Sequence, residues 1–149
     1  MSRLPEAPPD AVAVEFEVPF HDVDFLQVVW HGHYCKYLEL ARTALLRSRE
    51  VDAPQMFALG YRFYVSETHL RHLAPLRYGE KARAAAWVLD ADNRIRIGCE
   101  VTSLDTGRRV AEGLTVLVTC TADGDLCFET PEPIYARLVG TAGDREVRS

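Results

Sequence analysis

The sequence has no long apolar run and no apolar leader. A membrane-spanning helix needs about 20 consecutive apolar residues, and every apolar run here is far shorter. Residues 1–10 are rich in proline and acid, so they lack the apolar segment of a secretory signal. We therefore expect a protein without a membrane span that works in the cytoplasm.

Basic residues are also fewer than acidic residues. Lys plus Arg is 17 against 22 for Asp plus Glu, which gives a formal net charge of −5 at pH 7. Proteins that bind nucleic acid need a basic surface that neutralises phosphates, and the basic residues here are spread along the chain without forming a tail. The charge balance argues against nucleic acid as a partner, whereas local basic residues are compatible with a small phosphorylated ligand.

Cysteine patterns typical of metal sites are absent. Cys35, Cys99, Cys120 and Cys127 match neither a zinc ribbon nor a CxxC motif, and in the cytoplasm such residues are expected to be free thiols. Cys35 lies one helical turn after His31, but packing is the more frequent role of a cysteine on an apolar helix. The sequence therefore predicts no structural metal and no cofactor.

The length suits one domain. The chain has 149 residues, of which 48% are hydrophobic, and this is enough to bury a substantial core. We expect residues 1–10 to be a disordered lead, because their prolines block regular structure. Residues 11–138 are then the single domain, and residues 139–149 are a polar tail that we expect to be disordered.

One long helix is predicted among several strands. Residues 32–50 show helical periodicity, and further apolar residues broaden the apolar face, which indicates a helix enclosed by a sheet. The residues that share this face are Tyr34, Tyr37, Leu38, Ala41 and Leu45.

Alternation of apolar and polar residues predicts the strands. One further helical turn is expected at 55–60 and a short turn or helix around 131–133. Because the last four strands follow one another at hairpin distance, the sheet is predicted to be antiparallel. The fold class is therefore α+β, with a sheet of about five strands wrapped around one long central helix. The predicted strands are 11–19, 61–73, 81–89, 95–102 and 109–121.

Residues able to carry chemistry lie immediately before this helix, namely Asp22, Asp24, His31 and His33. The free N–H groups and partial positive charge of a helix start can stabilise the oxyanion that forms when a carbonyl carbon is attacked. A carboxylate nearby can act as the nucleophile or as the base that activates water. The segment therefore predicts acyl transfer.

The same segment resembles the signature of the 4-hydroxybenzoyl-CoA thioesterase-like family, which consists of hotdog-fold acyl-CoA thioesterases. That signature reads aromatic-x-Asp-x-Asp-x-x-Gly-x-Val-aromatic-His-x-x-Tyr, then Glu-x-Ala-Arg-Thr. The predicted order of helix and strands also fits the hotdog fold, so the resemblance covers about residues 12–128. The matching residues are Phe20, Asp22, Asp24, Val29, Trp30, His31, Tyr34, Glu39, Ala41, Arg42 and Thr43.

The resemblance implies roles for individual residues. Asp24 takes the place of the catalytic carboxylate, and His31 that of the family histidine, whose backbone N–H points at the thioester carbonyl. Phe20, Trp30 and Tyr34 are then candidates for binding the substrate. The resemblance also implies a homodimer with paired sheets and an acyl groove between subunits, or a tetramer of two such dimers.

The sequence departs from the family signature at two places. Phe20 stands where the family often has Tyr, so a phenol hydroxyl is lost. Leu26 and Gln27 occupy the turn where the family has Gly, which lets the chain bend and a ligand approach closely. A larger residue in this turn narrows the pocket or marks a different acyl group.

Structural interpretations stay open beside the catalytic ones. Asp24 is also suited to capping a helix or turn, and His31 to a satisfied buried position. Trp30 and Tyr34 are equally suited to core packing. For Asp22, a turn or a structural hydrogen bond is favoured over chemistry.

Metal and phosphate binding are weaker hypotheses. His31 and His33 with Asp24, or His69 with His72, supply too few ligands at metal-site spacing, and the last two face opposite sides of a strand. Four arginines are candidates for coenzyme A phosphates, although solvated strand faces are the default interpretation. They are Arg71, Arg77, Arg94 and Arg96.

The leading hypothesis is a hydrolase of an acyl-CoA or acyl-carrier-protein thioester. Asp24 serves as nucleophile or general base, and the helix start at His31 is the oxyanion hole. One alternative is a hotdog hydratase or dehydratase, and another is a non-catalytic protein that binds acyl thioesters, which Leu26 and Gln27 favour. The sequence leaves open the acyl group, the carrier and the choice between dimer and tetramer.

Overall fold

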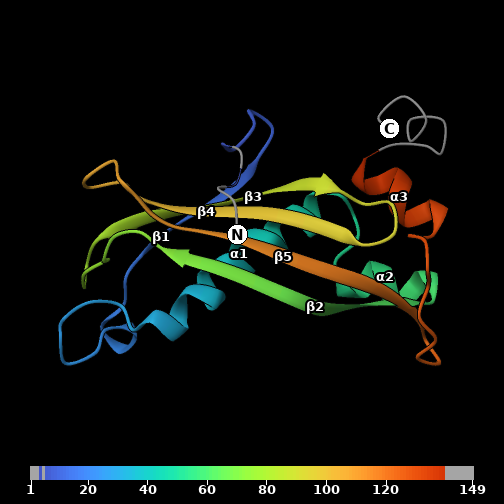
Figure 1. Ribbon diagram of the computed structural model, residues 1–149, viewed down its shortest axis with the longest axis horizontal. Coiled ribbons are helices and arrows are strands. Elements are labelled where there is room, and N and C mark those ends of the chain that lie inside the picture. The colour runs from blue at the N-terminus through green and yellow to red at the C-terminus, as the bar shows by residue number, and fades with distance from the viewer. Residues whose placement is uncertain (1–3, 5, 140–149) are drawn as a thin grey trace.

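Five strands form one antiparallel sheet in the computed structural model, which describes residue 4 and residues 6–139. The spatial order of the strands is β1-β3-β4-β5-β2, so β1 and β2 lie at the two edges (Figure 1). All five predicted strands are confirmed, and their bounds lie within two residues of the predicted ones. The strands are β1 (Val12–Glu17), β2 (Tyr61–His72), β3 (Lys81–Asp90), β4 (Ile95–Ser103) and β5 (Arg109–Thr121).

The predicted long helix is confirmed as α1 (Tyr34–Ser48), which lies across one face of the curved sheet. Its first predicted residues instead form a 3-10 turn, η2 (His31–His33), because the N–H of His33 bonds to the carbonyl of Trp30. The expected further turn is the helix α2 (Ala53–Leu59), whose first N–H is capped by the Asp52 side chain.

The remaining helical segments are short. A 3-10 turn, η1 (Phe20–Asp22), follows β1, and α3 (Glu132–Leu138) confirms the helix expected near the C-terminal prolines. Within the described part of the chain, no helix combines the length and apolar character that crossing a bilayer requires.

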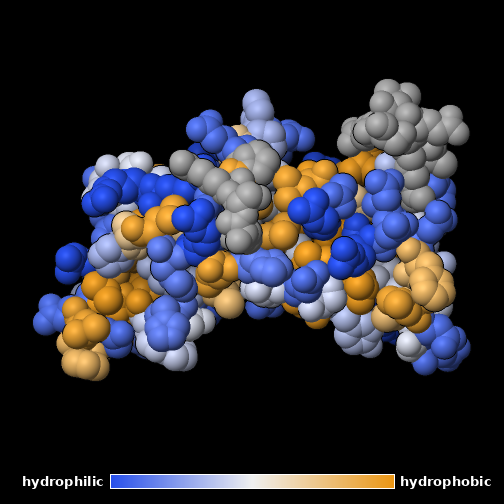
Figure 2. Space-filling view, viewed as in Figure 1, coloured by the Kyte–Doolittle hydropathy of each residue, from blue (hydrophilic) through white to orange (hydrophobic). Residues whose placement is uncertain are grey.

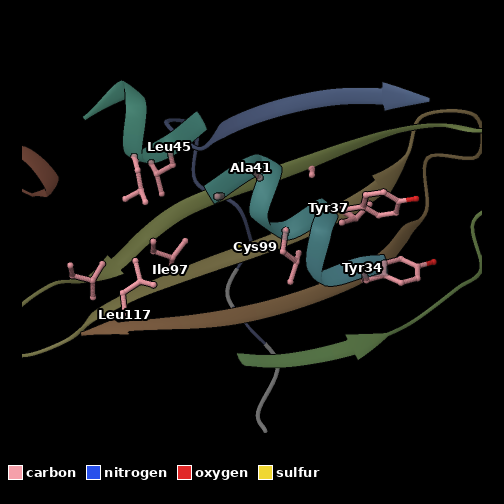
Figure 3. Packing of buried hydrophobic residues seen from close by; sticks show 14 of the residues in the cluster. Tyr34, Tyr37, Ala41, Leu45, Ile97, Cys99 and Leu117 are labelled. Atoms are coloured by element: carbon pink, nitrogen blue, oxygen red, sulfur yellow. The ribbon is translucent and has the colours of Figure 1, made fainter. Parts of the chain in front are cut away.

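The core lies between α1 and the sheet. Ile95, Ile97, Cys99 and Val101 alternate along β4 and are fully buried, as expected for the inward face of a strand. They meet the predicted apolar face of α1, and Figure 3 shows Tyr37, Ala41 and Leu45 above Ile97 and Cys99. On β5, a Cβ at Gly113 would stand 2.7 Å from Leu38 Cδ1, so the missing side chain lets α1 approach the sheet. The buried face of α1 is Tyr34, Tyr37, Leu38, Ala41, Leu45 and Leu46.

The helix is covered on one face only, which differs from the enclosed helix that the sequence suggested. α1 packs on β1, β3 and β4, whereas Leu40 on its other side is 43% exposed. The edge strand β2 is also open, with Tyr64 54% and Val65 49% exposed. A single sheet can cover only one side of a helix, so the apolar residues on the other side remain uncovered in one chain.

Ion pairs cover the outer face of the sheet. Glu112 of β5 is buried and accepts hydrogen bonds from Arg71 at 3.3 Å and from Arg109 at 2.9 Å. The guanidinium of Arg109 also lies 2.6 Å from Glu100 Oε2. The arginines of this face are therefore neutralised by carboxylates of neighbouring strands.

Candidate active site around Asp24

Residues 22–30 form a small hairpin that precedes α1. The N–H of Trp30 bonds to the carbonyl of Asp22, and Val23 and Val29 form an antiparallel bridge. A turn from Asp24 to Gln27 closes the hairpin through the bond from the Gln27 N–H to the Asp24 carbonyl, 2.9 Å long. The sequence alone predicts no hairpin here, because polar residues interrupt the apolar alternation.

Gln27 adopts a left-handed backbone conformation, with a φ of +65°. A turn followed by one left-handed residue is a common hairpin closure with a bulge, and Gly is the usual residue at that position. Gln27 therefore keeps the backbone conformation that the family signature assigns to Gly. The substitution changes the side chain in the turn without abolishing the turn.

The Asp24 carboxylate is held by its own turn. Its Oδ1 accepts a 2.9 Å hydrogen bond from the N–H of Leu26, as in an Asx turn. Its Oδ2 accepts no hydrogen bond from the residues that the structure describes, and the residue is half-buried. The capping interpretation of Asp24 is thus true for one oxygen, while the second oxygen is available to a substrate or a water molecule.

Asp24 lines an open cavity of about 730 Å³. Phe20 and Tyr78 form part of its wall, with their ring centroids 5.5 Å apart in an edge-to-face arrangement. Figure 2 shows apolar side chains gathered at this end of the molecule, over the loop that precedes α1. The residues that line the cavity are Phe20, Val23, Asp24, Phe25, Gln27, Arg77 and Tyr78.

The other predicted site residues form a second cluster. The Trp30 and His31 ring centroids are 5.1 Å apart, and His72, at the end of β2, lies 5.0 Å from Tyr34 and 6.2 Å from His31. Burial, followed by the charge of His31, lowers the pKa of His72. His72 therefore favours its neutral form beside the start of α1.

Sequence reasoning did not connect His72 with the site. The register of β2 on β5 shows which face each histidine is on. His72 pairs with Ala111 on the inner face, and His69 pairs with Leu114 on the outer face. This confirms that the two histidines face opposite sides. No local pattern shows that the end of β2 lies beside the start of α1, because that contact depends on the packing of the whole domain.

Asp24 and His31 lie at opposite ends of the hairpin. No hydrogen bond joins Asp24 to His31 among the described residues. The Asp24 N–H bonds to the Val28 carbonyl near the tip of the hairpin, whereas His31 follows Trp30 at its base. The backbone N–H groups of His31 and Gly32 have no acceptor in the described part of the chain, as expected for the first residues of a helical segment.

Trp30 and Tyr34 differ in what they offer a substrate. Trp30 is 48% exposed, and its ring lies so close over Gly32 that a Cβ there would be 2.2 Å from it. Tyr34 is 3% exposed and packs against Tyr37 and His72, and burial raises the pKa of its phenol. In the single chain, Trp30 can contact a ligand, whereas Tyr34 is a core residue.

Asp22 has the structural role that the sequence analysis favoured. Its side chain is buried and accepts hydrogen bonds from Lys36 Nζ at 2.5 Å and from the Tyr37 hydroxyl at 2.6 Å. Both donors are on α1, so Asp22 ties the hairpin to the helix. Among the described residues, no three His, Cys, Asp or Glu side chains gather in a way that could hold a metal ion.

Comparison with known families adds to this geometry. Residues 18–138 match the model of the thioesterase-like superfamily. The chain belongs to this superfamily. The matched range contains the hairpin, the helix and four of the five strands, and the fold is the hotdog fold, as the sequence predicted. Membership in the narrower 4-hydroxybenzoyl-CoA group stays a prediction.

Individual relatives in the thioesterase-like superfamily are distant. A Synechocystis sp. protein with a provisional assignment as an esterase is 29% identical over 121 residues, which are 80% of this chain and 73% of that protein. A Bacillus subtilis protein with a provisional assignment as an acyl-CoA thioesterase is 30% identical over 76 residues, or 51% of this chain and 55% of that one.

A solved structure shows the same fold. The 1,4-dihydroxy-2-naphthoyl-CoA thioesterase of Synechocystis superposes with a TM-score of 0.76 over 86% of this chain and 95% of that chain. The two sequences are 16% identical, so the likeness establishes the hotdog architecture and leaves the substrate open.

Proposed function

We propose that the protein hydrolyses acyl thioesters, with coenzyme A as the carrier, and that Asp24 is the catalytic carboxylate. The observation that carries this proposal is the free Oδ2 of Asp24 in a cavity of about 730 Å³, in a chain of the thioesterase-like superfamily. The names of its relatives support a thioester as the substrate. In the reaction, water adds to the acyl carbon, the carbon–sulfur bond breaks, and a carboxylic acid and a thiol are released.

The Asp24 carboxylate has two possible roles that use the same atom. Oδ2 either attacks the carbonyl carbon and forms an anhydride that water then cleaves, or it takes a proton from the attacking water. The Asx turn fixes Oδ1 on the Leu26 N–H. A carboxylate held in this way needs no reorientation before it reacts.

The oxyanion site in this proposal is the start of the helical segment at His31. The free N–H groups of His31 and Gly32 lie at the positive end of α1, which follows directly. His31 therefore acts through its backbone N–H, while its ring packs with Trp30 and His72. Phe20 and Trp30 supply exposed aromatic surface for the acyl group, and Tyr34 packs against His72 from the core.

We further propose that a second copy of the chain completes the site. In one chain, Asp24 and the helix start are separated, and the inner side of the edge strand β2 is open. The outer edge of β2, a strand of 12 residues, has no neighbouring strand among the described residues, so it presents free N–H and C=O groups to a partner. Pairing of β2 with β2 of a second copy would join two sheets and cover the exposed side of α1, and two such dimers would make the tetramer.

The first test is thiol release from a panel of acyl-CoAs, from aromatic to long-chain aliphatic, with wild type and Asp24→Asn in parallel. Loss of a catalytic carboxylate is expected to lower kcat by about 100-fold or more, with unchanged thermal stability. Asp123→Asn, on an exposed turn, is the matched control and should keep full activity. Near-normal turnover by Asp24→Asn would overturn the assignment.

The same assay separates the alternatives. A non-catalytic binding protein would bind acyl-CoA tightly and release no thiol, and a hydratase or dehydratase would change the acyl chain while the thioester stays intact. Acyl-carrier-protein thioesters are the second panel if the coenzyme A esters are not cleaved.

A further inference from the structure

Arg77 occupies a rigid position at the edge of the Asp24 cavity. It opens a turn that is closed by the bond from the Glu80 N–H to the Arg77 carbonyl, 3.1 Å long, with Gly79 in the left-handed conformation. The preceding Leu76 is fully buried, and its carbonyl accepts the Val29 N–H from the hairpin. The backbone of Arg77 is therefore fixed relative to the hairpin that carries Asp24.

The nearby carboxylates do not neutralise the Arg77 guanidinium. Glu80 Oε1 accepts from the backbone N–H of Arg77 at 3.2 Å, and Asp24 Oδ1 accepts from the N–H of Leu26. Among the described residues, the Arg77 side chain has neither an ion pair nor a hydrogen bond. An exposed cation thus lines the same cavity as the free Asp24 oxygen.

The other three arginines that the sequence nominated for phosphate binding are already paired. Arg71 lies 3.3 Å from Glu112, Arg94 lies 3.2 Å from Glu67, and Arg96 lies 2.8 Å from Asp90. Binding of a phosphate to one of these guanidinium groups would compete with its carboxylate partner. Arg77 has no such competitor, so it is the member of the set that is free to bind an anion.

Resting on the proposed function of this cavity, we propose that Arg77 binds an anionic group of the thioester substrate. A guanidinium binds phosphate or carboxylate through paired, charge-assisted hydrogen bonds. The anion is either a phosphate of the pantetheine carrier or a carboxylate on the acyl group. The aromatic wall of Phe20 and Tyr78 beside it accepts the uncharged part of the same molecule.

The test compares thioesters that differ only in charge. The acyl group that wild type cleaves fastest is attached to coenzyme A, to 4′-phosphopantetheine and to uncharged pantetheine, and succinyl- and butyryl-pantetheine supply an acyl carboxylate and its neutral counterpart. The enzymes are wild type, Arg77→Gln, Arg77→Lys and the ion-paired control Arg96→Gln. Each is measured for kcat and KM at low and high salt.

We expect Arg77→Gln to raise KM about tenfold or more for the anionic thioesters and to leave the pantetheine ester within about twofold, with kcat little changed. Arg77→Lys should recover part of the loss, and the salt dependence of KM should disappear in Arg77→Gln. An increase in KM confined to the two phosphorylated carriers identifies the phosphate as the bound anion. An increase confined to succinyl-pantetheine identifies the acyl carboxylate. An equal increase in KM for all esters, or no increase for any of them, would overturn the proposal.

A second measurement keeps this inference separate from the proposed catalysis. If wild type cleaves none of the thioesters, binding of free coenzyme A, of succinyl-pantetheine and of uncharged pantetheine is measured by calorimetry. Coenzyme A binding that Arg77→Gln weakens about tenfold, and that Arg96→Gln does not, supports the anion site without hydrolysis. Equal binding of both anionic ligands by wild type and Arg77→Gln would refute it.

Discussion

The phenol of Tyr37 in α1 donates a 2.6 Å hydrogen bond to the carboxylate of Asp22 in the segment before the helix. Both side chains are buried, and Lys36 Nζ lies 2.5 Å from the other carboxylate oxygen. Because the backbone of Asp22 also accepts the Trp30 N–H, this contact fixes the base of the hairpin that carries Asp24. A structural carboxylate thus positions a neighbouring candidate for catalysis.

Asp22→Asn should destabilise the fold. The amide keeps the size of the side chain but removes the charge that pairs with Lys36 and strengthens the bond from Tyr37. We expect the free energy of unfolding to fall by about 1–3 kcal/mol, a range that allows for solvent screening at the half-exposed Lys36. Urea unfolding at pH 7 measures it, with Asp123→Asn as the control. A variant as stable as wild type would show that Asp22 anchors nothing.

The same carboxylate makes stability depend on pH. Burial opposes its ionisation, but the hydrogen bonds from Lys36 and Tyr37 prevail, so the pKa of Asp22 lies below its ordinary value of 3.8. The folded chain therefore binds this proton less readily than the unfolded chain. Its stabilisation is complete above the ordinary pKa and is lost as pH falls through the lower, folded value.

We therefore expect the stability gap between wild type and Asp22→Asn to be constant at neutral pH and to narrow below about pH 4. Urea unfolding from pH 3 to pH 7 measures this gap. Asp52, whose pKa is lowered first by the Ala53 N–H, responds in the same direction but equally in both proteins, so it cancels. A gap that stays constant down to pH 3 would mean that folding does not lower the pKa of Asp22.

Gln27 offers a test of the hairpin turn. At a φ of +65°, Gly removes backbone strain of about 1 kcal/mol but adds a comparable entropy to the unfolded chain. Gln27→Gly should therefore stay within about 0.5 kcal/mol of wild type. Gln27→Val should cost about 1–2 kcal/mol, because a β-branched residue is strained there. Urea unfolding of both variants decides, and equal stabilities would mean that the left-handed turn is not maintained in solution.

The sequence was sufficient for much of the fold, because the signals are local. Alternation from Ile95 to Val101 and helical spacing from Tyr34 to Leu45 each reflect which side chains face the core, and both elements are confirmed. The family signature supplied what periodicity does not, namely the hotdog topology and Asp24 as a candidate.

The site was less predictable, because it depends on contacts between distant segments. No local pattern shows that His72 meets Tyr34, or that Arg77 shares a cavity with Asp24 while Arg96 is paired with a carboxylate. The catalytic roles, the disordered ends and the cytoplasmic location stay predictions. Residues 1–3 and 5 of the expected lead and residues 140–149 of the expected tail lie outside the described residues.

The open edge of β2 gives the last prediction, which concerns the second copy of the chain. Val65 is 49% exposed on β2, whose outer edge has no neighbouring strand in the described part of the chain, so a partner strand would cover it. Val65→Lys would place a charge in that contact and is expected to raise the dimer dissociation constant about tenfold or more. Glu17→Lys, on the opposite edge strand β1, is the control.

Light scattering over a concentration series measures the mass, and thiol release is followed on the same samples. If Asp24 needs a second chain, activity should fall together with the dimer fraction. A wild-type monomer with full activity would show that one chain suffices.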